Sequence, residues 1–210
     1  MSVRCKLLPF FLVLSFSVPA ISASPTPSGT LLLIGDVLSF NQRIVWQRIF
    51  ELSGGDAADI VVIAAAHSRA KLYGGYAQRA LSRYGPFVEL LPLAVSPAEF
   101  NTHYRQAAHN PELVEQVQES NAVFFVGGAP QHLAEVMFSE TGSPTPLAMA
   151  ISQVYAAGGV IVGGIPGAAG AYTDIDAMRV LKQGQVPNNQ LYQGLGLLAE
   201  GLYADQHFFS

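Results

Sequence analysis

The sequence predicts an α/β protein built on a doubly wound, mainly parallel sheet, and two features of the chain lead to this prediction. Apolar runs of strand length recur five times, at residues 30–34, 59–65, 87–93, 122–126 and 160–162. These runs are continuous rather than alternating, which is typical of parallel strands buried on both faces. The segments between them have helical length and periodicity, and an alternation of strands and helices with short turns gives a doubly wound sheet.

Four of the intervening segments are predicted to be helices. Residues 44–52 carry apolar side chains at a spacing of three and four, which predicts a helix capped by Asn41 and ended by Gly54 and Gly55. Three more helices are predicted at residues 73–84, 130–138 and 146–157. The chain is long enough for one domain with a sizeable core but short for two, so we expect residues 30–210 to form a single α/β domain.

The N-terminus has the pattern of a secretory signal peptide. Arg4 and Lys6 give a positive start, an apolar run follows at residues 7–18, and small residues occupy much of 20–24. The run is too short to span a bilayer as a helix. We therefore expect residues 1–24 to be removed on export to the periplasm or the medium, with residues 25–29 as a linker. A membrane anchor or a buried N-terminal helix is the alternative.

Composition excludes several classes of function. Fifteen acidic residues outnumber eleven basic ones, for a net charge of −4. This charge argues against non-specific binding to nucleic acid and is compatible with a cationic substrate. The only cysteine, Cys5, lies within the expected signal peptide, so the mature chain has no disulfide and no thiol nucleophile. Because Cys5 precedes the apolar run, a lipoprotein anchor is not expected, nor is any membrane association after cleavage.

No cofactor is expected from the sequence. Four histidines, His67, His103, His109 and His132, lack the spacing of metal ligands, and we place them on surfaces or at helix ends. The glycine-rich turns are not phosphate loops, because no Gly-Lys-Ser/Thr follows them and the first strand lacks a Gly-x-Gly-x-x-Gly turn.

The first turn of interest follows the run at residues 122–126. Gly127 and Gly128 lie between this strand and a helix beginning near Pro130. Paired glycines let backbone N–H groups approach a ligand, and a helix N-terminus favours negative charge, as an oxyanion requires. The alternative is a tight turn with no further role.

The second turn has the form of a nucleophile elbow without a nucleophile. Residues 160–170 run from a strand into a bend lined with small residues, as an elbow requires. Pro166 occupies the centre of the Gly-x-Ser-x-Gly frame that starts at Gly164, and moving the frame by two residues places Ala168 there. Neither side chain can attack a carbonyl group.

The third turn is Asp205-Gln206-His207-Phe208, which follows the glycine-rich residues 194–198. Histidine is a natural general base near neutral pH, and the neighbouring Asp and Gln are suited to binding polar substrate groups. A solvated surface histidine is the alternative for His207.

In order and spacing, these three turns resemble the cyanophycinase-like serine peptidases. That family has a Gly-Gly-Asp-Gln turn, a Gly-Thr-Ser-Ala-Gly elbow and an Asp-Gln-His-Phe strand, and the last motif is present here in full at residues 205–208. The resemblance runs from about residue 31 to the last residue. It implies a fold of the flavodoxin-like or class I glutamine amidotransferase-like type, a homodimer, and serine-type hydrolysis of the arginine-bearing β-linked aspartate polymer or of β-aspartyl peptides.

Carried over by position, the resemblance also implies a set of site residues. His207 takes the position of the general base, and Pro166 takes that of the nucleophilic serine. The implied backbone donors to an oxyanion are Gly128 and Gly167. The implied substrate contacts are Gln131, Asp205 and Gln206.

The departures from the family pattern favour loss of catalysis. Pro166 replaces the serine, and Ala129 and Pro130 interrupt the Gly-Gly-Asp-Gln turn. The family's acidic residue lies beyond the histidine strand, after which this chain is short, so we expect a truncated domain. Two alternatives to an impaired hydrolase stay open: a pseudoenzyme that binds an arginine-rich or β-aspartyl ligand without cutting it, and a degraded gene product.

Overall fold

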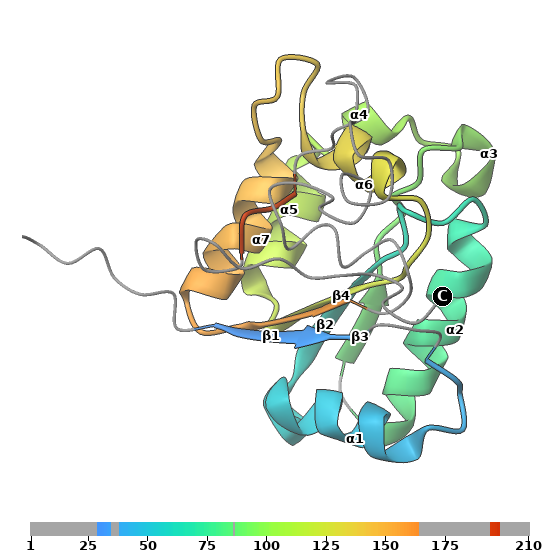
Figure 1. Ribbon diagram of the computed structural model, residues 1–210, viewed down its shortest axis with the longest axis vertical. Coiled ribbons are helices and arrows are strands. Elements are labelled where there is room, and N and C mark those ends of the chain that lie inside the picture. Colours follow the sequence, from blue (N-terminus) through green and yellow to red (C-terminus); the bar gives the residue numbers. More distant parts are fainter. Residues whose placement is uncertain (1–28, 35–37, 86, 164–193, 198–210) are drawn as a thin grey trace, which may run out of the picture.

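A five-stranded, fully parallel sheet forms the centre of the protein. The computed structural model describes residues 29–34, 38–85, 87–163 and 194–197 (Figure 1). The strand order is β1-β5-β4-β2-β3. The strands are β1 (Thr30–Leu33), β2 (Asp59–Ile63), β3 (Phe87–Leu90), β4 (Ala122–Phe125) and β5 (Val160–Gly163). The doubly wound α/β fold predicted from the sequence is therefore confirmed.

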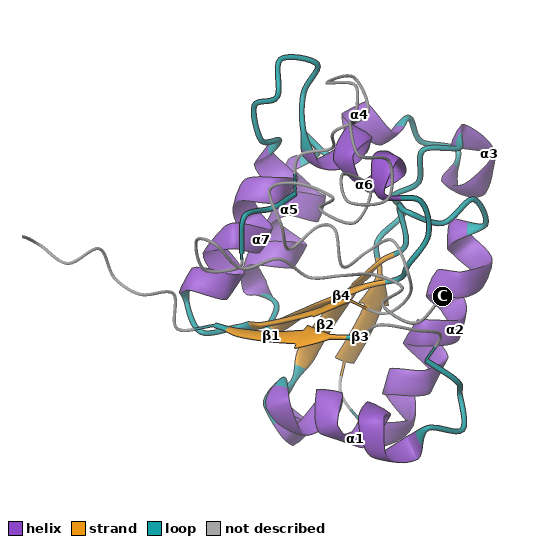
Figure 2. Ribbon diagram, in the orientation of Figure 1, coloured by secondary structure: helices purple, strands orange, loops and turns teal. Residues whose placement is uncertain are grey.

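Helices cover both faces of the sheet (Figure 2). Helices α1 (Arg43–Leu52) and α2 (Ala70–Leu81) pack on one face, and α5 (Pro111–Glu119), α6 (Pro130–Met137) and α7 (Pro146–Ala156) pack on the other. The described part also contains the short helices α3 (Pro97–Phe100) and α4 (Tyr104–Ala107) and the 3₁₀ turns Gly55–Ala57 and Ser82–Tyr84. No helix among the described residues has the length and hydropathy needed to cross a membrane.

Alternate residues of each central strand point into two separate cores. In β4, Val123 and Phe125 join the core beneath α5, α6 and α7, whereas Ala122 and Phe124 join the core beneath α1 and α2. Every residue of β4 is buried, as the continuous apolar run predicts for a central parallel strand. Burial on both faces thus explains why these strands lack a polar alternation.

Two predicted helices, α1 and α2, begin or end elsewhere, for identifiable reasons. The N-cap of α1 is Gln42 rather than Asn41, and its side-chain oxygen accepts a hydrogen bond from the Ser39 amide at 2.6 Å. Helix α2 begins at Ala70 instead of residue 73, because the carboxylate of Glu99 accepts a hydrogen bond from the Lys71 amide at 2.8 Å. Its last predicted turn, up to residue 84, is a 3₁₀ helix.

Side-chain caps mark the starts of α5 and α7. Asn110 accepts a hydrogen bond from the Glu112 amide, and Thr145 accepts one from the Ala148 amide. Each cap is followed by proline at the first helical position, where the missing N–H costs nothing. Helix α5 was not among the predicted helices, although Asn110 and Pro111 are the signal that identifies its start.

Candidate functional site at the carboxyl edge of the sheet

The direction of winding reverses between β2 and β4. β2 leads into α2 on one face of the sheet, whereas β4 leads into α6 on the opposite face (Figure 2). The two strands are direct neighbours, with Ile63 opposite Phe125. In doubly wound sheets, ligands bind at such a reversal, outside the carboxyl ends of the two strands. The loops that follow β2 and β4 therefore form the candidate site.

These two loops are held together by backbone contacts. The Ala129 amide donates a hydrogen bond to the Ala66 carbonyl at 2.8 Å. A Cβ atom at Gly128 would overlap that carbonyl and would lie 2.8 Å from the Cα of His67. Only glycine fits here without forcing the loops apart, so the sequence signal at Gly128 reflects a close approach of two backbones.

His67 contributes a half-buried imidazole to this edge. Its Nδ1 accepts a hydrogen bond from the Arg69 amide at 3.0 Å, so the neutral ring carries its proton on Nε2. The ring stacks on Tyr73, with centroids 3.8 Å apart. Burial lowers the pKa of His67, the positive charge of Arg69 lowers it further, and Glu99 acts in the opposite direction. His67 is therefore a neutral hydrogen-bonding group at pH 7.

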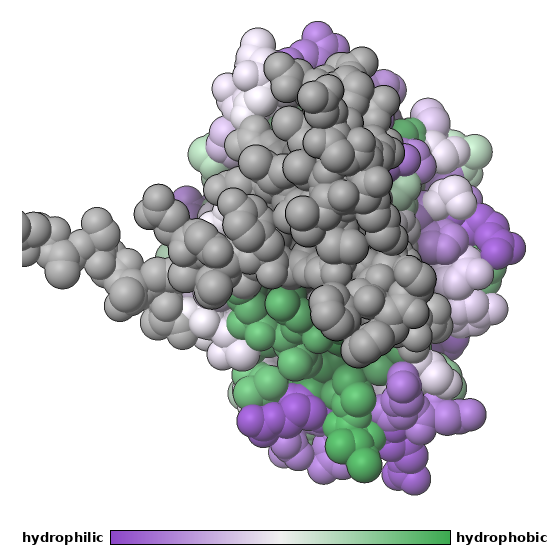
Figure 3. Space-filling view, viewed as in Figure 1, coloured by the Kyte–Doolittle hydropathy of each residue, from purple (hydrophilic) through white to green (hydrophobic). Residues whose placement is uncertain are grey.

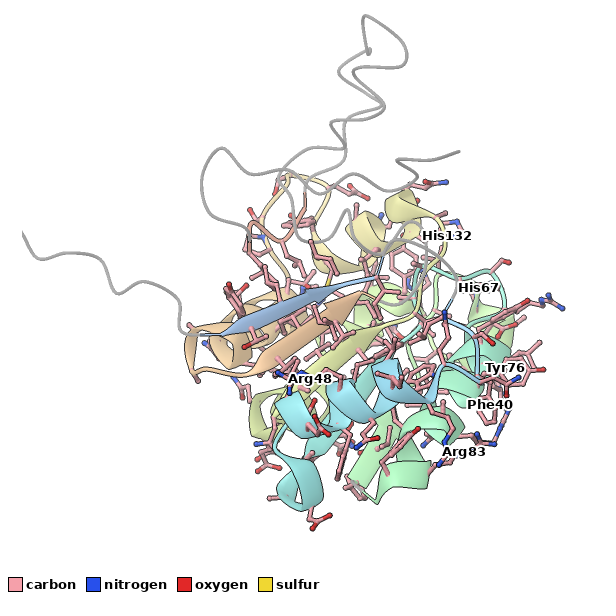
Figure 4. All side chains as sticks on the ribbon, turned by 60° about the horizontal axis from the view of Figure 1, so that its bottom comes forward. Phe40, Arg48, His67, Tyr76, Arg83 and His132 are labelled. Atoms are coloured by element: carbon pink, nitrogen blue, oxygen red, sulfur yellow. The ribbon has the colours of Figure 1, made fainter. Side chains whose placement is uncertain are left out.

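The first turn of α6 supplies a second imidazole. Gln131 and His132 are both half-buried there, directly after the Gly127–Gly128 turn. The Nδ1 atom of His132 is buried and has no hydrogen-bond partner among the described residues. Figure 4 shows His67 and His132 at the same end of the sheet, on elements that follow β2 and β4. A buried polar atom without a partner is unusual and is commonly found where a ligand or an ordered water binds.

Of the residues predicted from the sequence, Gly128 and Gln131 lie in the described structure and Pro166, Gly167, Asp205, Gln206 and His207 lie outside it. β4 and β5 pair in register, with Phe125 opposite Gly163. The ends of β4 and β5 therefore lie side by side at the same level of the sheet. Convergence of the third turn, at residues 205–207, on this edge stays a prediction.

Sequence reasoning missed His67. It was expected on a surface or at a helix end, whereas it is half-buried in the loop after β2. His103 and His109 do lie at the ends of α4, where each forms a hydrogen bond with the backbone of Arg105. The signal for His67 is its position just past the carboxyl end of a central strand, where functional side chains gather.

The described edge offers two imidazoles, an amide side chain and backbone N–H groups. The part of the chain that the structure describes contains no group of three or more His, Cys, Asp or Glu residues that could hold a metal ion. A search of protein-family models found none that matches this chain. What these residues can do chemically is to form directional hydrogen bonds with a polar ligand at the sheet edge.

Proposed function

We propose that the protein is an exported relative of the cyanophycinase-like serine peptidases that binds an arginine-bearing or β-aspartyl peptide without hydrolysing it. The observation that carries the proposal is the register between β4 and β5, with Phe125 opposite Gly163. This register brings together the ends of the two strands that precede the Gly-Gly turn and the elbow-like segment in the sequence. A serine peptidase of this kind needs that arrangement, because its oxyanion donors must lie next to its nucleophile.

Binding without cleavage follows from the residues at the elbow. Pro166 and Ala168 occupy the two frames in which a serine would stand, and neither has a nucleophilic atom. The site's binding groups do not depend on a serine, since Gln131 and the Gly128 backbone belong to a separate turn. The net charge of −4 is consistent with a ligand that carries a guanidinium group.

Titration calorimetry with the dipeptide β-aspartyl-arginine tests the binding half of the proposal. We expect saturable binding that is weaker in the Gln131→Ala variant. The Gln131 side chain caps no helix and lies half-buried at the site. Gly75→Ala is the matched control, because a methyl group there would meet only an Arg79 nitrogen, at 3.4 Å. Absence of binding to the unaltered chain, or equal binding to the Gln131 variant, would contradict the proposal.

A further inference from the structure

A cavity of about 440 Å³ lies on the face of the sheet covered by α1 and α2. Its volume falls within the range of sites that bind small molecules. The lining is almost entirely apolar and is rich in aromatic rings. The lining residues are Leu38, Ser39, Phe40, Trp46, Tyr73, Tyr76, Ala77, Arg79, Phe124 and Val126.

The floor of this cavity is rigid. Trp46 is only 4% exposed, and its ring stacks on Phe124 with centroids 5.6 Å apart. The indole N–H donates a hydrogen bond to the Ser39 carbonyl at 3.0 Å, which fixes the ring's orientation. A rigid, flat, apolar floor favours a ligand with planar rings, because such a ligand loses little freedom on stacking.

The mouth of the cavity exposes aromatic side chains to solvent. Tyr76 is 47% exposed and Phe40 is 37% exposed. Figure 4 shows the side chains of Phe40, Tyr76 and Arg83 gathered at one end of the α1 and α2 layer. Figure 3 shows a contiguous apolar surface in the lower part of this view. Ile44 of α1 and Leu33 of β1 are also exposed. Contiguous apolar surface of this kind commonly marks a binding site.

Two arginines give the mouth a positive charge. The Arg83 guanidinium lies 3.5 Å from the centroid of the Phe40 ring, and the Arg79 guanidinium lies 4.9 Å from that of Tyr76. Neither is paired with a carboxylate among the described residues, whose two ion pairs are Arg48 with Glu51 and Arg105 with Glu140. In a chain with net charge −4, two unpaired cations beside an apolar cavity select for a negative ligand.

We propose that this cavity binds a small planar aromatic anion, with its rings stacked near Trp46 and its anionic group between Arg79 and Arg83. Arginine suits both parts of such a ligand, since its planar group pairs with carboxylate or sulfonate and also stacks on rings. The cavity is distinct from the Gly127–Gly128 turn, because none of residues 127–132 lines it; it shares with the carboxyl edge only the contact between Tyr73 and His67.

The test uses the full chain and 1-anilinonaphthalene-8-sulfonate, an aromatic sulfonate with a planar naphthalene ring. Trp46 is the only tryptophan of the chain, so emission transferred from it to the probe reports binding within the transfer distance of this ring. The matched neutral probe is N-phenyl-1-naphthylamine, which lacks only the sulfonate. We expect one equivalent of the sulfonate probe to bind, with an affinity at least about tenfold higher than that of the neutral probe.

Variants assign the binding to the cavity. Ala77→Leu fills the cavity and should abolish energy transfer to the probe. Arg79→Gln and Arg83→Gln should each lower the affinity for the sulfonate probe about tenfold and leave the affinity for the neutral probe unchanged. Arg48→Gln is the control, because Arg48 lies elsewhere on α1, away from the labelled Phe40, Tyr76 and Arg83 in Figure 4.

Tyr76→Ser, at an exposed position, replaces Ala77→Leu if the larger side chain prevents folding. The proposal would be overturned by equal affinity for the two probes, or by undiminished energy transfer in a folded cavity variant. It would also be overturned if Arg48→Gln lowered the affinity for the sulfonate probe as much as Arg79→Gln and Arg83→Gln do.

Discussion

The imidazole of His67 lies against the ring of Tyr73, with centroids 3.8 Å apart and planes inclined by 27°. His67 follows β2 and Tyr73 belongs to α2, so this stack fixes the loop that leads from the sheet edge into the helix. The same contact removes part of the imidazole from water, and burial is the main reason that the pKa of His67 is lowered.

The lowered pKa of His67 predicts a dependence of stability on pH. Below the ordinary value of 6.5, the unfolded chain binds a proton that the folded chain resists. The contribution of His67 to the free energy of unfolding is therefore complete above pH 6.5 and is lost as the pH falls from there toward the lowered pKa. Urea unfolding at a series of pH values measures this, and His67→Gln should flatten that part of the profile. An unchanged profile in the variant would contradict the prediction.

Asp59 predicts a dependence of the opposite sign. Burial raises its pKa above the ordinary value of 3.8, and the negative charges of Glu89 and Glu119 raise it further. The folded chain therefore holds this proton more tightly than the unfolded chain, and the resulting stability is lost as the pH rises from 3.8 through the raised pKa. Asp59→Asn should raise the free energy of unfolding at pH 7, as measured by thermal or urea unfolding. Equal or lower stability of the variant would show that the carboxylate is better solvated than its burial indicates.

The close approach at Gly128 predicts a large cost for any side chain there. Gly128→Val should destabilise the fold by roughly 1–3 kcal/mol, because the side chain would overlap the Ala66 carbonyl. Gly75→Ala, on an open face of α2, should instead stabilise the protein by up to about 1 kcal/mol. Urea unfolding of both variants measures the contrast. Similar stabilities would mean that the loops after β2 and β4 separate easily.

The proline at the elbow position predicts an absence of hydrolysis. The purified chain should release no β-aspartyl-arginine from the polymer above a buffer control, as measured by chromatography of the products. Pro166→Ser adds a hydroxyl group but no other member of a catalytic triad, so we expect it to restore little turnover alone. Product formation by the unaltered chain that disappears in His207→Ala would show that another group acts as nucleophile.

The N-terminal pattern predicts export. Intact mass of the protein recovered from the cell envelope or the medium should correspond to cleavage after Ser22, Ala23 or Ser24. Lys6→Glu, combined with Arg4→Glu, reverses the charge of the start and should slow processing. Recovery of a chain that retains residues 1–23 would contradict the prediction.

The sequence identified the starts of all five strands, but it placed the ends of β1 to β4 too late and the end of β5 one residue too early. β2 ends at Ile63, although Ala64, Ala65 and Ala66 continue the apolar run and are fully buried. These alanines lie where the chain leaves the ladder and packs against the Gly128 loop, so burial persists after strand pairing stops. Apolar pattern reports burial, and only the neighbouring strand determines where pairing ends.

Contacts between distant segments account for the rest of the differences. The start of α2 depends on Glu99, which is distant in sequence from Lys71. The role of Gly128 was predicted as a ligand-facing turn, and the structure adds a steric requirement set by the loop that contains His67. The aromatic cavity combines residues that precede α1 with residues of α2 and β4, and no local motif marks such a combination.

The pairing of β1 with β5 sets an order for folding. Thr30 lies opposite Val160, so β1 has no place in the sheet until nearly all of the described chain is present. β2, β3 and β4 pair over much shorter stretches of sequence and can assemble first, since closing a shorter loop costs less entropy. β1 should therefore be the last described strand to dock, and refolding should show a slow phase that reports on it. During synthesis, β1 is the first described strand to leave the ribosome, but β5, with which it pairs, is the last described strand to be made.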